Sequence, residues 1–154
     1  MYYMGNQPTF SVNYGSSNVV LQLDHELDTD EDGLADFWEA EHFGFANAGS
    51  PIGDGDLDQF QNRSEMIAGT NPNDPWDFLR IDRVTLADGG ITLEWANVIG
   101  KHYALWISNT LAPNAFTPSI IDMTSADDRI YLHVPSGTEK LEYYRLEVSD
   151  PGLE

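Results

Sequence analysis

Asp28-Thr-Asp-Glu-Asp-Gly-Leu-Ala-Asp-Phe-Trp-Glu39 is a twelve-residue stretch with carboxylates at positions 1, 3, 5, 9 and 12 and glycine at position 6. Calcium takes about six to eight oxygen ligands, and a loop with this spacing wraps around the ion. Gly33 permits the tight turn that such a loop requires. The ligands predicted for a first calcium ion are Asp28, Asp30, Asp32, the carbonyl of Leu34, Asp36 acting through water, and Glu39.

A second stretch, Asp54-Gly-Asp-Leu-Asp-Gln-Phe-Gln-Asn-Arg-Ser-Glu65, repeats this ligand pattern. It departs from the first at position 6, where Gln59 replaces glycine. A left-handed backbone costs a non-glycine residue about 1 kcal/mol, so we expect the second site to be weaker or slightly distorted. The ligands predicted for a second calcium ion are Asp54, Asp56, Asp58, the carbonyl of Phe60, Asn62 and Glu65.

The net charge of −19 is concentrated around these two loops. Residues 24–77 carry fifteen acidic side chains and a single basic one, Arg63. Such a surface repels phosphates, which argues against nucleic acid or anionic lipid as a partner, and it attracts cations. The chain has no cysteine, so a metal ion is the expected staple in place of disulfides. No signal peptide opens the sequence, so the chain is expected to be either cytosolic or a piece of a longer exported protein. No apolar run approaches the roughly 18 residues of a membrane span.

The acidic segment is flanked by regions of strand-like sequence. Alternating apolar residues at 10–14 and 19–23, around the Gly/Ser/Asn turn at 15–18, predict a β-hairpin. Within the acidic segment, the spacing predicts short helices over 34–43 and 62–68, each ended by a glycine. The first of these should bury Leu34, Phe37, Trp38 and Glu41 on one face.

From Asp77 onward the periodicity changes to two, which predicts a small antiparallel β-sandwich. Without a Cys…Trp…Cys framework, a fibronectin III-like sandwich is favoured over a true immunoglobulin domain. The residues expected to face its core are Ile91, Leu93, Trp95, Tyr103, Leu105 and Ile107. The expected strands are 78–86, 90–98, 102–108, 116–122, 129–134 and 141–149.

The expected fold class is therefore mainly β with a small helical insert. Residues 1–23 form the hairpin, 24–76 the paired calcium-loop and short-helix module, and 77–154 the sandwich. The loops differ from EF-hands because a strand-like segment precedes the first, and because their apolar residue stands at position 7 and not at position 8.

Stretch 28–75 closely resembles the thrombospondin type 3-like calcium repeats of bacterial surface proteins. The first loop and Glu65-Met-Ile-Ala-Gly-Thr-Asn-Pro72 look like the paired halves of that repeat. Residues 10–23 resemble the last coil of a bacterial β-helix adhesin, and 91–148 resemble the small sandwich that follows such repeats. These resemblances imply a non-catalytic spacer, extracellular or at the cell surface, exported within a larger precursor whose upstream domains are its partners.

Two other classes of function have to be weighed, a binding module and an enzyme. By strand alternation the aromatic residues Trp106, Tyr131 and Tyr143 point away from the core, where they could bind a glycan or a cell-surface protein. The favoured alternative is that Trp106 packs against the calcium module. A dockerin-like role would need a recognition pair in both halves, but Phe37-Trp38 and Arg63-Ser64 do not repeat. No nucleophile motif, phosphate loop or zinc-protease helix is present, so we expect no enzyme activity.

Overall fold

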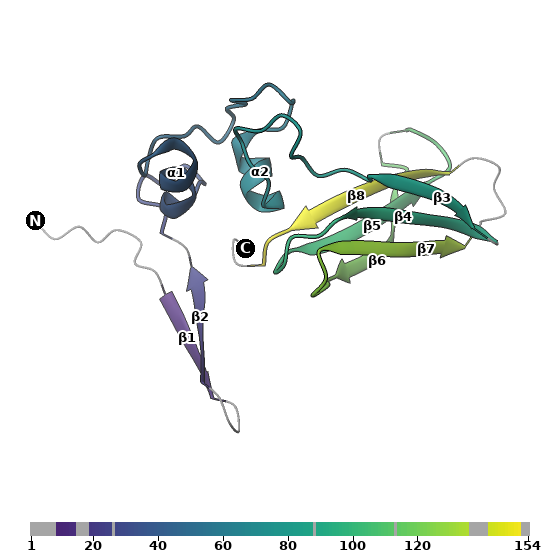
Figure 1. The fold of residues 1–154 in the computed structure, drawn as a ribbon, viewed down its shortest axis with the longest axis horizontal. Coiled ribbons are helices and arrows are strands. Elements are labelled where there is room, and N and C mark those ends of the chain that lie inside the picture. The colour runs from purple at the N-terminus through teal and green to yellow at the C-terminus, as the bar shows by residue number, and fades with distance from the viewer. Residues whose placement is uncertain are drawn as a thin grey trace, which may run out of the picture. The chain divides into compact units, whose positions relative to one another are not determined.

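The structure is a computed structural model that describes residues 9–14, 19–25, 27–87, 89–112, 114–135 and 142–151. The chain forms two compact units (Figure 1). The described residues up to Phe78, together with Pro151, form the first unit, and Leu79–Asp150 form the second. The fold is mainly β with two short helices, as the sequence predicted.

The first unit begins with a two-stranded antiparallel hairpin of β1 (Thr9–Tyr14) and β2 (Val19–His25). Tyr14 pairs with Val19, which confirms the predicted strand pairing. The turn predicted at 15–18 lies outside the described residues.

Two helices follow, α1 (Asp36–Phe43) and α2 (Asn62–Ala68). Both end at the predicted glycines, Gly44 and Gly69, which adopt left-handed conformations with φ of 95° and 74°. Glycine pays no steric cost in this conformation, so each helix can close with its capping N–H bonded back to the last turn. The predicted C-terminal ends of both helices are therefore confirmed.

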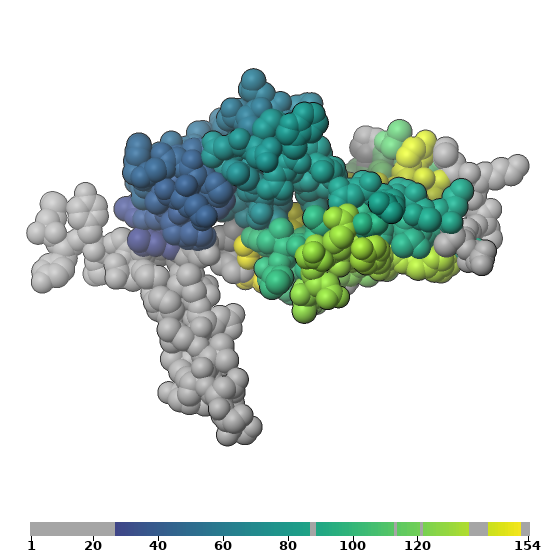
Figure 2. All heavy atoms as spheres, in the orientation of Figure 1, coloured from purple at the N-terminus to yellow at the C-terminus, as the bar shows by residue number. Residues whose placement is uncertain are grey.

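The predicted buried face of α1 was correct for Leu34 and Trp38 and wrong for Phe37 and Glu41. The helix begins at Asp36, so Leu34 belongs to the loop and does not set the phase of the helical face. Phe37 is 54% exposed, and Glu41 is exposed too, whereas Trp38 and Glu39 are buried. The core of this unit joins the half that contains the first loop and α1 to the half that contains the second loop and α2. Met66 of α2 packs with Leu34, Ala35 and Trp38, and Phe43 borders them. The two halves accordingly form one continuous mass of blue and blue-green atoms in Figure 2.

The second unit is a sandwich of two three-stranded antiparallel sheets (Figure 1). This strand arrangement is consistent with the expected antiparallel β-sandwich. The first predicted strand starts later than expected, at Arg83 instead of residue 78. One sheet has the order β3-β4-β7 and the other β6-β5-β8. The strands are β3 (Arg83–Ala87), β4 (Gly90–Ala96), β5 (His102–Ser108), β6 (Thr117–Met123), β7 (Arg129–Pro135) and β8 (Tyr143–Ser149).

The core of the sandwich contains the residues that strand alternation predicted. Leu93 and Trp95 of β4 are fully buried, as is Leu105 of β5, and Tyr103 is 1% exposed. Ile91 and Ile107 pack against them as partly buried neighbours. Alternate residues of a strand face opposite sides of its sheet, which is why a period of two was sufficient to identify this core.

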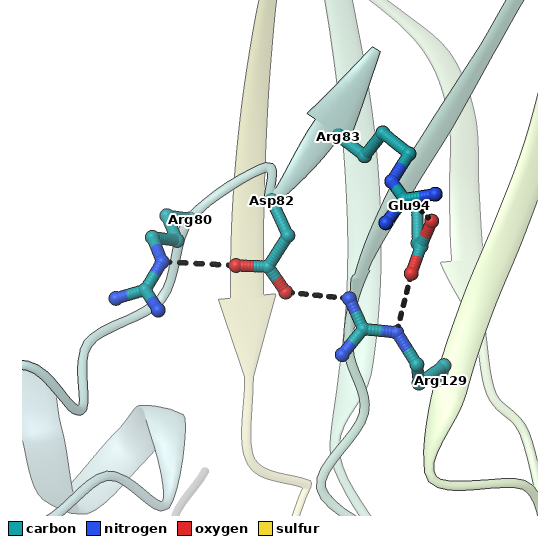
Figure 3. A network of polar contacts seen from close by, with 5 residues as sticks. All are labelled: Arg80, Asp82, Arg83, Glu94 and Arg129. Carbon is teal, nitrogen blue, oxygen red and sulfur yellow. Dashed lines mark hydrogen bonds and ion pairs between the residues drawn. The ribbon is translucent and has the colours of Figure 1, made fainter. Parts of the chain in front are cut away.

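A network of ion pairs fastens the start of β3 to its sheet (Figure 3). Arg129 of β7 donates to Asp82 at 2.7 Å and to Glu94 of β4 at 2.7 Å. Arg80 donates to the other oxygen of Asp82 at 2.9 Å, and Arg83 lies 3.4 Å from Glu94. Burial alone would raise the pKa of Asp82, but the hydrogen bonds from Arg129 and Arg80 outweigh it and lower that pKa. The network holds three neighbouring segments of one sheet together.

Candidate metal centre

The first acidic loop gathers three carboxylates at one point. Asp28, Asp30 and Asp32 each offer an oxygen within 4.8 Å of the other two. The backbone N–H of Gly33 donates to Asp28 Oδ2 at 2.9 Å, and that of Leu34 donates to Asp32 Oδ1 at 2.8 Å. Gly33 has φ of 96°, so this loop uses the glycine at position 6 as predicted.

The second acidic loop has the same backbone arrangement. Asp54, Asp56 and Asp58 also bring oxygens within 4.8 Å of one another. Gln59 N–H donates to Asp54 Oδ2 at 3.0 Å, and Phe60 N–H donates to Asp58 Oδ1 at 2.7 Å. These bonds match those of the first loop position by position, and Gln59 adopts φ of 81° despite its side chain.

Position 4 of each loop is left-handed as well, with φ of 58° at Glu31 and 69° at Leu57. Sequence reasoning did not predict these conformations, because neither residue is one that favours positive φ. Only the repetition of the whole pattern in both loops could have suggested that the two share a conformation.

Glu65 is the most unusual carboxylate of the second loop. It is 1% exposed, yet neither of its carboxylate oxygens has a hydrogen-bond partner among the described residues. The same holds for one buried oxygen each of Asp56, Asp58 and Asn62. Buried polar atoms without partners are costly and rare in native proteins. A cluster of five such oxygens, all hard ligands, fits a calcium ion.

Burial and the same crowding of carboxylates raise the pKa values of Glu65 and Asp56. Burial, and then the charges of Asp56, Asp58 and Asp54, raise the pKa of Glu65 to about 7. The pKa of Asp56 is raised too, first by desolvation and then by its acidic neighbours. A divalent cation among these groups would reverse their mutual repulsion. The second loop therefore has the donor set and the unmet charge that a bound cation would satisfy.

The first loop is closed differently. Glu39 is fully buried, but its Oε2 accepts the N–H of Asn47 at 2.7 Å and its Oε1 accepts the N–H of Gly49 at 2.9 Å. Local desolvation and the nearby charges of Asp32 and Glu39 raise the pKa of Asp30, which shows that Glu39 lies near the loop. A carboxylate has about four lone-pair sites, so these amide bonds leave Glu39 able to ligate a cation.

Asp36, predicted to act through water, is held by Thr29. The backbone N–H of Thr29 donates to Asp36 Oδ1 at 2.7 Å, and the Thr29 hydroxyl contacts Asp36 Oδ2. These bonds tie the start of α1 to the first residues of the loop.

The three aromatic residues considered for ligand binding do not form one patch. Trp106 and Tyr143 belong to β5 and β8 of one sheet, whereas Tyr131 belongs to β7 of the other. Arg145 covers the ring of Trp106, with its Cζ 5.1 Å from the ring centroid, and Tyr131 is 65% exposed.

A second group of polar side chains lies on the sandwich. His102 contacts Asp122 through Nδ1, and Ser149 faces His102 in the β5–β8 ladder. They line a shallow pocket of about 230 Å³. No hydrogen bond joins Ser149 to His102 in the described part of the chain.

The sequence did not identify the contacts that join the two loops. Arg63 of α2 donates from Nη1 to the carbonyl oxygen of Gly33 at 2.7 Å. The N–H of Ala35 points at the sulfur of Met66 at 3.3 Å. The isolation of Arg63 as the lone basic residue of the acidic segment was a signal that it has a special neighbour, but spacing could not reveal which one.

Comparison with known proteins supports a calcium module. The family model of the bacterial TSP3 repeat matches residues 28–44 and 60–75, which contain the whole first loop, the second half of the second loop and both helices. No curated protein and no solved structure matches the chain. TSP3 repeats are structural calcium-binding modules and are not catalytic. The bacterial form is typical of exported proteins, and no helix among the described residues is long and apolar enough to cross a membrane.

Proposed function

We propose that this chain is a non-catalytic spacer, part of a larger bacterial surface or secreted protein, that is rigidified by two calcium ions. The observation that carries the proposal is the set of buried, unpartnered oxygens around Glu65. The TSP3 family match includes Asn62 and Glu65 of this set, and it supports calcium as the ion. The resemblances to a β-helix on one side and to a fibronectin III-like sandwich on the other support the role of a joint.

The two ions would be held by the two acidic loops. The first ion would take Asp28, Asp30, Asp32, the Leu34 carbonyl, Glu39 and, through water, Asp36. The second ion would take Asp54, Asp56, Asp58, the Phe60 carbonyl, Asn62 and Glu65. Calcium supplies charge neutralisation here and no chemistry, and each loop supplies oxygens from both its turn and its following helix.

The ions would act mainly as a folding staple. The acidic segment holds fifteen carboxylates against one arginine, and mutual repulsion of that density opposes a compact state. Its hydrophobic core is small, with four buried residues, so little else offsets the repulsion. Binding of an ion to the folded state alone adds its binding free energy to stability. We therefore assign the calcium ions the role that disulfides play in other small exported domains.

The proposed setting is outside the cell, where calcium is plentiful enough to fill even sites of modest affinity. In this proposal residues 1–23 end an upstream β-helix, 24–76 form the joint, and 77–154 form the sandwich that follows it. The partners are the upstream domains of the same polypeptide.

The test is hydrogen exchange read segment by segment, on the full chain, with calcium and with a chelator. We expect chelation to remove protection from 24–76 while the strands of the sandwich remain protected. Isothermal titration should show two calcium ions bound per chain. Magnesium at the same concentration serves as the control, because it demands a tighter octahedral site. Protection and melting that do not change on chelation would refute the proposal.

A further inference from the structure

Arg63 connects the two acidic loops through one hydrogen bond. It follows Asn62 at the start of α2, within the second loop, and its guanidinium donates to the carbonyl of Gly33 at position 6 of the first loop. The donor and acceptor are thirty residues apart in sequence. The only cation of the acidic segment is thus placed on the backbone of one loop by the helix that completes the other.

Gly33 is shaped to receive this contact. A Cβ at Gly33 would lie 2.0 Å from Arg63 Nη1, so a side chain at this position would displace the guanidinium from the Gly33 carbonyl. The equivalent residue of the second loop is Gln59, which has nearly the same backbone conformation and an exposed side chain. Glycine at 33 therefore serves both the left-handed backbone and the close approach of Arg63, whereas position 59 has the left-handed backbone alone.

The Gly33 carbonyl, which Arg63 holds, lies between two groups that shape the first loop. The N–H of Gly33 is bonded to Asp28, and the next carbonyl along the chain is that of Leu34, a proposed calcium ligand. Fixing the Gly33 carbonyl fixes the orientation of this part of the loop. At its other end Arg63 lies in the first turn of α2, next to Asn62 and two residues before Glu65, both proposed ligands of the second ion.

The linker between the loops is fastened to the same groups. Glu39 of the first loop binds the N–H groups of Asn47 and Gly49. The side-chain amide of Asn62 donates to the carbonyl of Ser50 at 2.9 Å, and the N–H of Arg63 donates to that of Pro51 at 3.1 Å. Glu39 and Asn62, one proposed calcium ligand from each loop, therefore bind neighbouring parts of the linker between the loops.

We propose that Arg63 is a positioning residue that couples the two calcium sites, so that an ion in loop 54–65 raises the affinity of loop 28–39. The ion would fix Asn62 and Glu65, these fix the start of α2, and α2 holds Arg63 on Gly33. By linkage, an ion in the first loop raises the affinity of the second by the same factor. This inference rests on the proposed calcium binding.

Simple electrostatics predicts the opposite effect for loss of Arg63. A positive side chain beside a cation site repels the cation, so removing its charge should tighten calcium binding. Coupling through position predicts weaker binding to the first loop. The direction of the change therefore separates the two explanations.

The experiment is calcium titration by calorimetry on the full chain and on Arg63→Gln. We expect two ions bound in both proteins, with the affinity of the first loop about fivefold or more weaker in the variant, in the range of ordinary allosteric coupling. The matched control is Arg83→Gln, which makes the same charge change on the exposed surface of the second unit and should leave both affinities unchanged. Circular dichroism of the calcium-loaded proteins checks that each is folded.

A double-mutant cycle completes the test. Glu65→Gln removes the second site and should weaken the first loop as much as Arg63→Gln does, and the double variant should weaken it no further. Should Arg63→Gln not fold, Gly33→Ala against the control Gln59→Ala asks the same question, because only the first displaces Arg63. Two ions bound with unchanged or tighter affinity in Arg63→Gln would overturn the coupling and leave the proposed function intact. A wild-type chain that binds no calcium would overturn the proposed function itself.

Discussion

The two acidic loops share a backbone and differ in how their last carboxylate is used. In both, the Asp at position 1 accepts the N–H of position 6, and the Asp at position 5 accepts that of position 7. Glu39 closes the first loop with both oxygens bonded to backbone amides, whereas Glu65 closes the second with neither oxygen bonded among the described residues. The ligand pattern alone cannot distinguish these situations.

This difference bears on which loop needs its ion more. Judged by the residue at position 6, loop 28–39 is the better calcium site, because it has Gly33 where the second loop has Gln59. Judged by its buried, unpaired oxygens, loop 54–65 needs its ion more, because leaving a buried carboxylate unpaired costs more than a left-handed glutamine. Four predictions can break or sharpen this comparison.

The largest effect is expected from Glu65→Gln on calcium binding. It removes one charge and one ligand oxygen from a set of buried oxygens that have no hydrogen-bond partner among the described residues, so calcium affinity at this loop should fall by about 100-fold or more. In calorimetry the titration should lose one ion per chain. Glu39→Gln is the paired variant, and an equal loss in both would mean that the two loops are equivalent after all.

The second prediction concerns stability without calcium. Glu39→Gln exchanges a charged acceptor of two backbone amides for a neutral one, with its NH₂ group facing an N–H, and should destabilise the chelated protein by about 2–4 kcal/mol. Under the same conditions Glu65→Gln removes an unpaired buried charge and should stabilise it. Denaturant unfolding in chelator measures both. Changes of the same sign in the two variants would contradict the comparison.

The third prediction is a pH dependence of the calcium-free protein. Folding raises the pKa of Glu65 from 4.5 to about 7, chiefly by burial, so the folded state binds the proton more tightly than the unfolded state. The contribution of Glu65 to stability is thus fully present below about pH 4.5 and is lost as the pH rises through 7. Melting temperatures in chelator should show this loss, and Glu65→Gln should remove it. Saturating calcium should abolish the loss as well.

The smallest effect is expected at position 6 of the second loop. Gln59→Gly relieves a left-handed glutamine at some entropic cost and should change stability by no more than about 1 kcal/mol in either direction. Gly33→Gln, the reverse exchange in the first loop, should cost clearly more, because the new Cβ would clash with Arg63. Equal costs in thermal melts would show that the backbone conformation alone decides this position.

Much of the fold was readable from the sequence because it rests on local rules. Alternation identified the core of the sandwich at Leu93, Trp95 and Leu105, and glycine identified the ends of both helices. The buried face of α1 was misjudged, because a two-turn helix that begins at Asp36 takes its orientation from the core that it joins. The first strand of the sandwich was placed too early, since nothing in residues 78–82 signals that β3 starts only at Arg83.

The sequence by itself determined the residues of the proposed ligand sets, since odd-numbered carboxylates, a turn at position 6 and a Glu at position 12 are properties of a short stretch of chain. It also determined the period of each strand and the charge of the acidic segment. Only the tertiary structure decided that Glu39 binds the linker, that the Glu65 carboxylate has no hydrogen-bond partner among the described residues, and that Arg63 donates to the Gly33 carbonyl. Those contacts join residues from separate parts of the chain, and they follow from how the two halves pack around Met66.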